Sequence, residues 1–230
     1  MLPELLRKLC TIEGLVWIRL LYCYPEEITE DLIQVMKEQP KVCHYLDLPI
    51  QHANDEILRR MGRRTSKQEL IDKIDFLRSE MPDITLRTTL ITGFPGETKE
   101  QHKELLEFIN DMEFDRLGVF TYSPEEGTPA AAMEHQIDEE VKLDRQAELM
   151  ELQQDISAEL GERRIGQELL VMIEGKVADE DAYVGRSQAD APGVDGYVFV
   201  NTPETLVSGD FVRVKITGAL EYDLIGEISQ

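Results

Sequence analysis

Two patterns of hydrophobic and polar positions divide the chain near residue 164. Before it, short apolar runs alternate with stretches whose apolar residues recur every three or four positions, as in amphipathic helices. Near-continuous apolar strands between such helices indicate a parallel sheet that helices cover. Two helix starts carry capping boxes, Ser66 with Glu69 and Thr98 with Gln101. The expected strands are 15–22, 42–50, 84–91 and 116–122, and the expected helices are 29–38, 54–61, 67–80, 99–112 and 139–162.

Beyond residue 164 the helical period disappears. Short β-rich runs at 169–173, 197–200, 211–216 and 224–228 are separated by turn sequences such as Ala191-Pro192-Gly193. Five or so short strands in this length predict a small barrel of the oligonucleotide-binding type. The sequence therefore predicts an α/β fold with two domains: a partial, TIM-like parallel barrel over residues 1–163, and a small all-β barrel over residues 164–230.

The chain is strongly acidic. Its 230 residues carry 46 acidic and 24 basic side chains, a formal net charge of −22. Residues 165–230 hold 12 acidic and 4 basic side chains, a net charge of −8. This charge argues against a broad phosphate-binding surface. Two interpretations stay open: a solvated surface that keeps the protein soluble, and a docking face for a basic protein.

Other features indicate a cytoplasmic protein. No apolar run approaches the roughly 18 to 20 residues that a membrane helix needs, so no membrane partner is expected, and no secretory signal is visible. Three cysteines, Cys10, Cys23 and Cys43, form neither a disulfide framework nor a zinc ribbon. Expected on a helix and two strands, they are more typical of core positions than of ligands. A monomer is expected.

Candidate chemistry gathers after the strands, where parallel barrels place their functional residues. His52 is either a general base or a structural hydrogen-bonding residue. Asp47 and Glu97 are candidates for an acid/base pair, although no spacing rule makes them face each other. Gly93 and Gly96 free the backbone either for a tight strand-to-helix turn or for the close approach of a ligand.

A dense basic run, Arg59-Arg60-Met61-Gly62-Arg63-Arg64, follows the second strand. It is either a helix C-terminus favoured by positive charge or a grip for an anion or carboxylate.

Three of these segments, taken in order, indicate a protein family more specifically than any one of them does. The order of 46–52 (LDLPIQH), 87–98 (RTTLITGFPGET) and 122–130 (YSPEEGTPA) resembles the methylthiotransferases of the radical S-adenosylmethionine superfamily. Residues 185–196 are similar to the interior of that family's TRAM domain. The match is best with the branch acting on a small-subunit ribosomal protein. The transfer RNA branch typically has Gln-Ser where this chain has Gln51-His52, and it lacks the Asp190-Ala191-Pro192 run.

The resemblance implies S-adenosylmethionine and two [4Fe-4S] clusters in the full-length enzyme. In this family one cluster, held by a Cys-x-x-x-Cys-x-x-Cys motif, reductively cleaves S-adenosylmethionine to a radical. That radical takes a hydrogen atom from the β-carbon of an aspartate. Thiolates suit such clusters. Because this sequence has no such motif, it is expected to ligate no cluster, to be inactive alone, and to correspond to the C-terminal portion of a longer enzyme.

The resemblance also implies cofactor-binding residues, and no catalytic residue is assigned. Gln51, Arg87 and Thr89 are expected at the ribose or amino acid moiety of S-adenosylmethionine. Thr92, Gly93 and Phe94 are expected along the adenine. The other side is expected to be closed by Tyr122 and Ser123.

Charge favours the ribosomal protein as substrate. A reader of transfer RNA is expected to have basic patches on its TRAM barrel, whereas this barrel is acidic. The predicted partner is therefore the basic small-subunit ribosomal protein, docked on the TRAM barrel, and not nucleic acid. Alternatives are a docking module without catalysis, a transfer RNA methylthiotransferase, and a cofactor-free enzyme using His52, Asp47 and Glu97. The last is disfavoured because four strands are too few to close an eight-stranded barrel.

Overall fold

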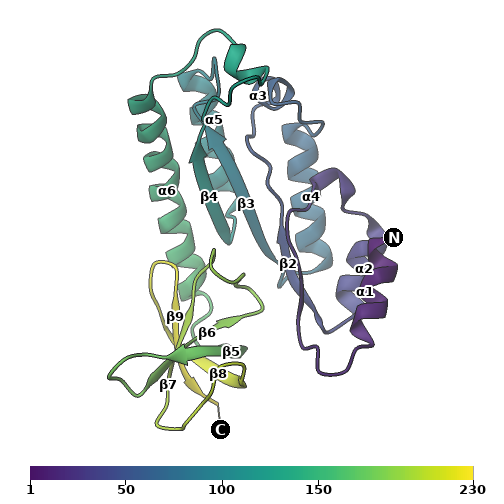
Figure 1. Cartoon of the computed structure of the whole chain (residues 1–230), viewed down its shortest axis with the longest axis vertical. Helices are drawn as coiled ribbons and strands as arrows, with labels where there is room; N and C mark the ends of the chain where they lie inside the picture. The colour runs from purple at the N-terminus through teal and green to yellow at the C-terminus, as the bar shows by residue number, and fades with distance from the viewer. Residues whose placement is uncertain (230) are drawn as a thin grey trace. The chain divides into compact units, whose positions relative to one another are not determined.

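The computed structural model describes residues 1–229 and places them in two compact units, described separately below. The first is Met1–Gln153 and the second begins at Gln154, so the division falls inside the long helix α6 (Glu139–Glu162) (Figure 1). The sequence-based boundary between the two domains, after residue 163, stays a prediction. Within the described residues, no helix is long and apolar enough to cross a membrane.

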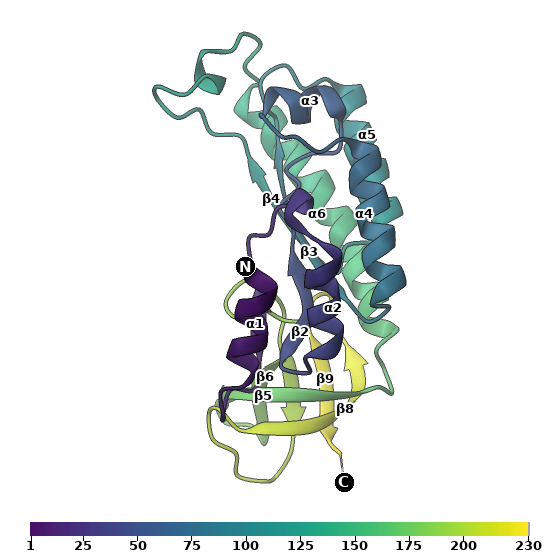
Figure 2. The ribbon, with the colours of Figure 1, turned by 90° about the vertical axis from the view of Figure 1, so that its right-hand side faces the viewer.

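The first unit is built on a four-stranded parallel sheet in the order β1-β2-β3-β4. Helices follow the strands along the chain, and α2, α4 and α5 lie on the same side of the strands (Figure 2). This confirms the expected α/β fold. The strands are β1 (Ile18–Leu20), β2 (Val42–Asp47), β3 (Thr85–Thr92) and β4 (Arg116–Thr121), and the helices before α6 are α1 (Leu2–Cys10), α2 (Glu30–Glu38), α3 (Asp55–Arg60), α4 (Lys67–Glu80) and α5 (Lys99–Met112), with short 3-10 turns η1 (Pro25–Glu27) and η2 (Ala130–Ala132).

Burial along β3 separates the two faces of the sheet. Leu86, Thr88 and Leu90 are buried, whereas Arg87 and Thr89 between them are half-buried. Successive side chains of a strand point to opposite faces, so the first set belongs to the apolar core and the second set to the other face. We call this second face, which carries Arg87 and Thr89, the polar face.

Local signals place the helices as expected. The helices α4, α5 and α6 have the predicted bounds. Both capping boxes are confirmed, with Ser66 and Glu69 bonded reciprocally at α4 and Thr98 and Gln101 at α5. Such caps satisfy backbone N–H groups that the first helical turn leaves unpaired.

The strands were predicted less well. The first is only three residues long, and Cys23 lies in the loop after it and not in a strand. The second ends at Asp47, three residues early, and the chain returns to the sheet at Gln51 through a single bridge to Leu90. The apolar residues Leu48 and Ile50 are buried, as their sequence suggests, but they belong to an irregular segment and not to a strand.

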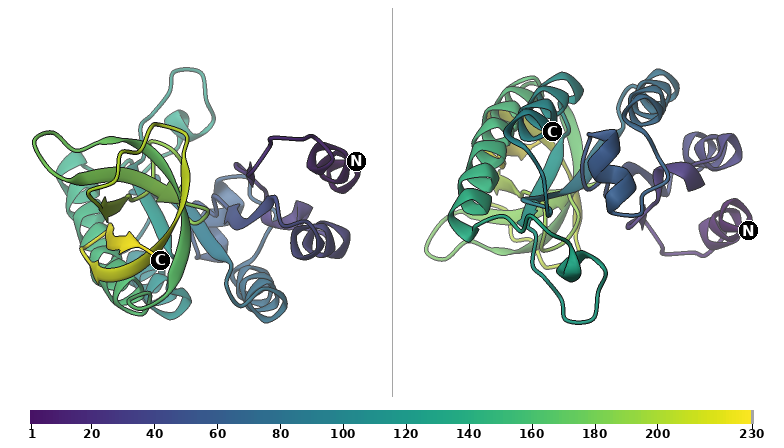
Figure 3. Two further views of the ribbon diagram at one scale, coloured as in Figure 1. Left: turned by 90° about the horizontal axis from the view of Figure 1, so that it is seen from below. Right: turned by 90° about the horizontal axis from the view of Figure 1, so that it is seen from above.

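The second unit contains a closed five-stranded barrel in the order β5-β6-β7-β9-β8 (Figure 3), which confirms the predicted OB-like barrel. Its strands are β5 (Glu168–Lys176), β6 (Ala182–Ser187), β7 (Val198–Asn201), β8 (Phe211–Ala219) and β9 (Leu224–Ile228). The runs noted in the sequence did not include β6. Its Gly185 interrupts the apolar pattern, yet a Cβ there would lie 2.6 Å from the backbone oxygen of Met172. Close packing of the two strands therefore requires glycine.

Candidate functional site

The polar face of the sheet joins Asp47, Arg87 and Thr89. Asp47 is paired with Arg87 across β2 and β3, and paired residues of neighbouring strands project to the same face. Arg87 Nη1 lies 3.1 Å from Asp47 Oδ1 and 3.1 Å from Thr89 Oγ1. The carboxylate is buried, so this ion pair is poorly screened by water. Arg87 and Thr89, two of the expected cofactor residues, are thus neighbours.

Gln51 lies beside them in an unusual conformation. Its φ is +73°, a value that residues other than glycine rarely adopt. The backbone is held on both sides by β3, because Gln51 N–H donates to Thr89 O at 3.0 Å and Ile91 N–H donates to Gln51 O at 2.8 Å. Within the described residues, the buried Gln51 Oε1 has no hydrogen-bond partner. A strained backbone that carries an unsatisfied amide oxygen is a plain candidate for ligand contact.

Thr92, Gly93 and Phe94 surround the carboxylate of Glu97. Glu97 Oε2 accepts hydrogen bonds from the N–H groups of Gly93 at 2.8 Å and Phe94 at 3.3 Å. Thr92 Oγ1 lies 3.4 Å from Glu97 Oε1. On the other side, Arg145 Nη1 from α6 lies 2.8 Å from Glu97 Oε1. Glu97 therefore anchors the loop after β3 and ties it to α6.

The glycines of this loop make room for the chain's own side chains. A Cβ on Gly93 would lie 2.4 Å from Lys142 Cγ, and one on Gly96 would lie 2.6 Å from Arg60 Nη1. Both have positive φ, +71° and +77°. The segment thus forms the tight strand-to-helix turn that was one of its two expected roles.

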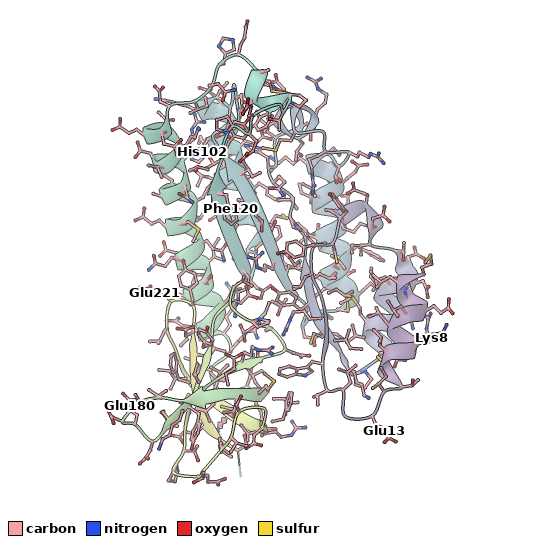
Figure 4. The ribbon with its side chains drawn as sticks, in the orientation of Figure 1. Lys8, Glu13, His102, Phe120, Glu180 and Glu221 are labelled. Atoms are coloured by element: carbon pink, nitrogen blue, oxygen red, sulfur yellow. The ribbon has the colours of Figure 1, made fainter. Side chains whose placement is uncertain are left out.

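His52 is a structural residue. Its side chain is fully buried, and Nδ1 accepts a hydrogen bond from Asn54 N–H at 2.9 Å. Nε2 lies 3.7 Å from Glu97 Oε2. Burial, followed by the neighbouring His102, lowers the pKa of His52 to about 3, so the ring stays neutral. His102, on α5, is labelled in Figure 4.

Asp47 and Glu97 form no acid/base pair with each other. Asp47 is bonded to Arg87 and to the backbone of Tyr22, whereas Glu97 is bonded to Arg145 and its own loop. Since each carboxylate has its own structural partners, the cofactor-free acid/base enzyme loses its geometric basis.

Phe94 and Tyr122 pack against each other over the end of the sheet. Their ring centroids are 5.2 Å apart in an edge-on arrangement, and both rings are buried. Lys142 Nζ donates to Tyr122 O at 2.9 Å. The Tyr122 hydroxyl is buried and has no partner within the described chain, whereas Ser123 is exposed. The ring pair therefore presents one open polar group, the hydroxyl.

The arginine run after the second strand is divided between roles. Arg60 lies over the Phe94 ring at 6.0 Å, and Arg63 lies over the Tyr24 ring at 5.0 Å and donates to Pro49 O. Arg59 and Arg64 are exposed. Two of the four arginines thus stiffen the loops at this end of the sheet, and α3 ends in this basic run as the helix interpretation expects.

The three cysteines do not fit an iron–sulfur cluster. Cys10 ends α1, Cys23 lies in the loop after β1, and Cys43 is buried in β2. No group of three or more potential ligands occurs among residues 1–229. Burial, and the charge of Asp47, raise the pKa of the Cys23 thiol to about 11, which disfavours the thiolate that binds metal.

The sequence reasoning missed Lys142, Arg145 and Tyr22. Lys142 and Arg145 are buried charged residues three positions apart in a helix that is otherwise rich in exposed charge. That spacing puts them on one face, but nothing in the sequence distinguishes them from solvated charges. Only the fold brings them to the loop after β3.

Comparisons with known proteins agree with this architecture. Residues 1–109 match the family model of the radical SAM superfamily, and residues 165–228 match that of the TRAM domain. The chain resembles a solved radical SAM enzyme, coproporphyrinogen III oxidase (HemN) from Escherichia coli, with a TM-score of 0.54 and 17% identity over 81% of this chain and 50% of that one. This likeness concerns the fold alone. The class is thus a radical SAM protein with a TRAM domain.

Sequence relatives define the branch. The chain is 61% identical to the ribosomal protein uS12 methylthiotransferase RimO of Lachnoclostridium phytofermentans, over 98% of this chain and 51% of the relative. It is 55% identical to RimO of Desulfitobacterium hafniense, over 100% of this chain and 51% of the relative. The chain belongs to the RimO-type methylthiotransferase family, as its motifs indicated, and spans about half the length of these relatives.

Proposed function

We propose that the full-length protein containing this chain is a radical SAM methylthiotransferase that adds a methylthio group to the β-carbon of an aspartate in small-subunit ribosomal protein uS12. The single observation that carries this proposal is 61% identity over 98% of the chain to a relative named for that activity. The choice of an aspartate as the modified residue rests on the family resemblance.

S-adenosylmethionine is the cofactor that the residues at the end of the sheet fit. The supporting observation is the pair of buried polar atoms without partners in the described chain, Gln51 Oε1 and Tyr122 Oη. Gln51, Arg87 and Thr89 would hold the ribose or amino acid moiety. Thr92, Gly93 and Phe94 would lie along the adenine, and Tyr122 and Ser123 would close the other side. When bound, S-adenosylmethionine supplies the radical chemistry.

The two [4Fe-4S] clusters have no place on these residues. The positions of Cys10, Cys23 and Cys43 do not suit a shared cluster, and the Cys23 pKa is raised by burial. We therefore place the cluster ligands in parts of the full-length enzyme outside this chain. By itself the chain is inactive as a transferase.

The TRAM barrel is proposed as the docking site for the basic protein. A groove of about 590 Å³ on this barrel is lined by three acidic side chains and no basic one: Asp181, Glu204 and Glu227. Two exposed acidic residues of the same unit lie on its loops, Glu180 between β5 and β6 and Glu221 between β8 and β9 (Figure 4). Such a surface attracts a Lys- and Arg-rich partner and repels the phosphates of transfer RNA. The enzyme is proposed to act as a cytoplasmic monomer.

A binding experiment tests this part of the proposal. The 230-residue chain is titrated with labelled uS12 and, separately, with labelled transfer RNA at low and moderate salt. We expect salt-sensitive binding of uS12, weakened by charge-reversing substitutions at Asp181 and Glu204. Exposed Glu159, on α6, is the matched control position for charge reversal. Micromolar, salt-sensitive binding to transfer RNA with none to uS12 would instead support the transfer RNA branch.

A docking module without catalysis is the second candidate. The observation that favours it is the acidic groove of the barrel, which suits the docking of a basic protein whether or not the full-length protein catalyses a reaction. It predicts uS12 binding by the chain without any modification by the full-length protein, and the two candidates are separated by mass spectrometry of uS12 after reaction.

A further inference from the structure

The loop after β1 holds an exposed aromatic residue in a strained conformation. Tyr22 is 82% exposed and its φ is +57°. A left-handed backbone is unfavourable for a residue other than glycine, because Cβ approaches the following carbonyl oxygen. The ring does not offset this cost in the described chain, since most of it faces solvent.

A buried carboxylate imposes this conformation. Asp47 is 3% exposed, and its Oδ2 accepts a hydrogen bond from Tyr22 N–H at 3.0 Å. Its backbone oxygen accepts one from Cys23 N–H at 2.8 Å. Its other carboxylate oxygen, Oδ1, is paired with Arg87. The loop backbone is therefore fixed by the same ion pair that organises the polar face of the sheet.

Strained residues that the surrounding structure holds in place gather at functional sites. Tyr22 follows β1 at the carboxyl end of the parallel sheet, where the loops after β2 and β3 carry the proposed cofactor residues. The two left-handed residues Tyr22 and Gln51 thus mark the same end of the sheet, and Gln51 carries an unsatisfied oxygen.

The surroundings of Tyr22 favour a cationic partner. The neighbouring Tyr24 ring already receives the Arg63 guanidinium at 5.0 Å. Glu26 and Glu27, both exposed, add negative charge two and three residues further on. An exposed aromatic ring attracts Lys or Arg side chains through its π face, and the exposed carboxylates further along the same chain segment add a longer-range attraction.

We propose that Tyr22 is a specificity-determining contact that receives a Lys or Arg side chain of the basic protein substrate, and that Asp47 is its positioning residue. This inference rests on the proposed function, because it takes uS12 as the substrate. The alternative, stacking of a nucleic acid base on the ring, is an outcome of the test.

The experiment compares full-length enzymes in steady-state methylthiolation of uS12. Tyr22→Gly removes the ring and suits the left-handed backbone, so the loop keeps its shape. A cation–π contact of about 0.5–2 kcal/mol corresponds to a roughly 2- to 30-fold rise in KM for uS12, with kcat largely retained. Tyr22→Phe keeps the π face and restores the wild-type KM. Phe76→Ala, at a partly exposed ring on α4, is the matched control.

The positioning role is tested by a double-mutant cycle. Asp47→Asn is expected to raise KM for uS12 when Tyr22 is present. The same substitution is expected to have little further effect on KM in the Tyr22→Gly variant. If its effect on KM for uS12 is equally large in Tyr22→Gly, Asp47 acts through Arg87 and the positioning role fails.

Each outcome has a distinct meaning. An unchanged KM in Tyr22→Gly, or no rescue by Tyr22→Phe, overturns the contact while leaving the proposed function intact. Binding of transfer RNA that weakens in Tyr22→Gly, with unchanged binding of uS12, overturns it in favour of base stacking. If the wild-type enzyme modifies no uS12, the proposed function fails and the inference fails with it.

Discussion

The anchor between Glu97 and Arg145 gives a sharp prediction on stability. The Glu97 side chain is 0% exposed and that of Arg145 is 9% exposed. Arg145 Nη1 contacts Glu97 Oε1 at 2.8 Å and Glu97 O at 3.2 Å. Arg145→Ala leaves a buried carboxylate whose remaining donors are the two N–H groups and the Thr92 hydroxyl of the loop. We expect a loss of about 3–5 kcal/mol in the free energy of unfolding, the range for breaking a buried pair.

Urea unfolding followed by fluorescence measures this loss. The only tryptophan of the sequence, Trp17, belongs to the first unit and reports on its unfolding. With a urea dependence of about 1–3 kcal/mol per molar, the midpoint shifts down by roughly 1 M or more. Lys103→Ala is the control, because it breaks an exposed pair with Glu107 and is expected to cost less than about 1 kcal/mol.

A second substitution separates charge from packing. Glu97→Gln in the Arg145→Ala background removes the uncompensated charge and keeps an acceptor for the loop N–H groups, so part of the lost stability returns. A loss below about 1 kcal/mol in Arg145→Ala, or a double variant less stable than Arg145→Ala, would refute this account of the anchor.

Three further predictions follow from the same region. Because the pKa of His52 is lowered to about 3 in the folded protein, the unfolded chain takes up a proton at this residue at a higher pH than the folded protein does. The free energy of unfolding of the wild type therefore falls as the pH drops from 6.5 towards 3. His52→Asn is expected to reduce this fall by roughly 2 kcal/mol between pH 7 and 5, measured by unfolding titrations. With a pKa near 11, Cys23 is alkylated at pH 8 at well under a tenth of the rate of a free thiol; equal rates would contradict its burial. Gly93→Ala forces a Cβ against Lys142 at positive φ and lowers stability by about 1–3 kcal/mol in urea unfolding, whereas Gly127→Ala, with positive φ but open space, costs less.

Much of the fold follows from local sequence signals. The capping boxes at Ser66 and Thr98 fix the starts of α4 and α5, and α6 has the bounds that were predicted for it. The failures occur where tertiary contacts override local pattern. Gly185 breaks the apolar run of β6 because the packing of β5 allows no side chain there.

The candidate site was predictable only in part. The family resemblance singled out Gln51, Arg87 and Thr89 together, and in the structure these three residues are neighbours. The partners of Glu97 were not predictable, because Arg145 lies 48 residues away and looks like any surface charge of an acidic helix. Long-range ion pairs leave no periodic signal in a single sequence.

The most direct test of the central claim is mass spectrometry of uS12 after incubation with the reconstituted full-length enzyme, S-adenosylmethionine and a reductant. The account predicts one added methylthio group, located on an aspartate, and loss of the reaction in Arg87→Ala. Unmodified uS12 together with methylthiolated transfer RNA in a parallel reaction would contradict it.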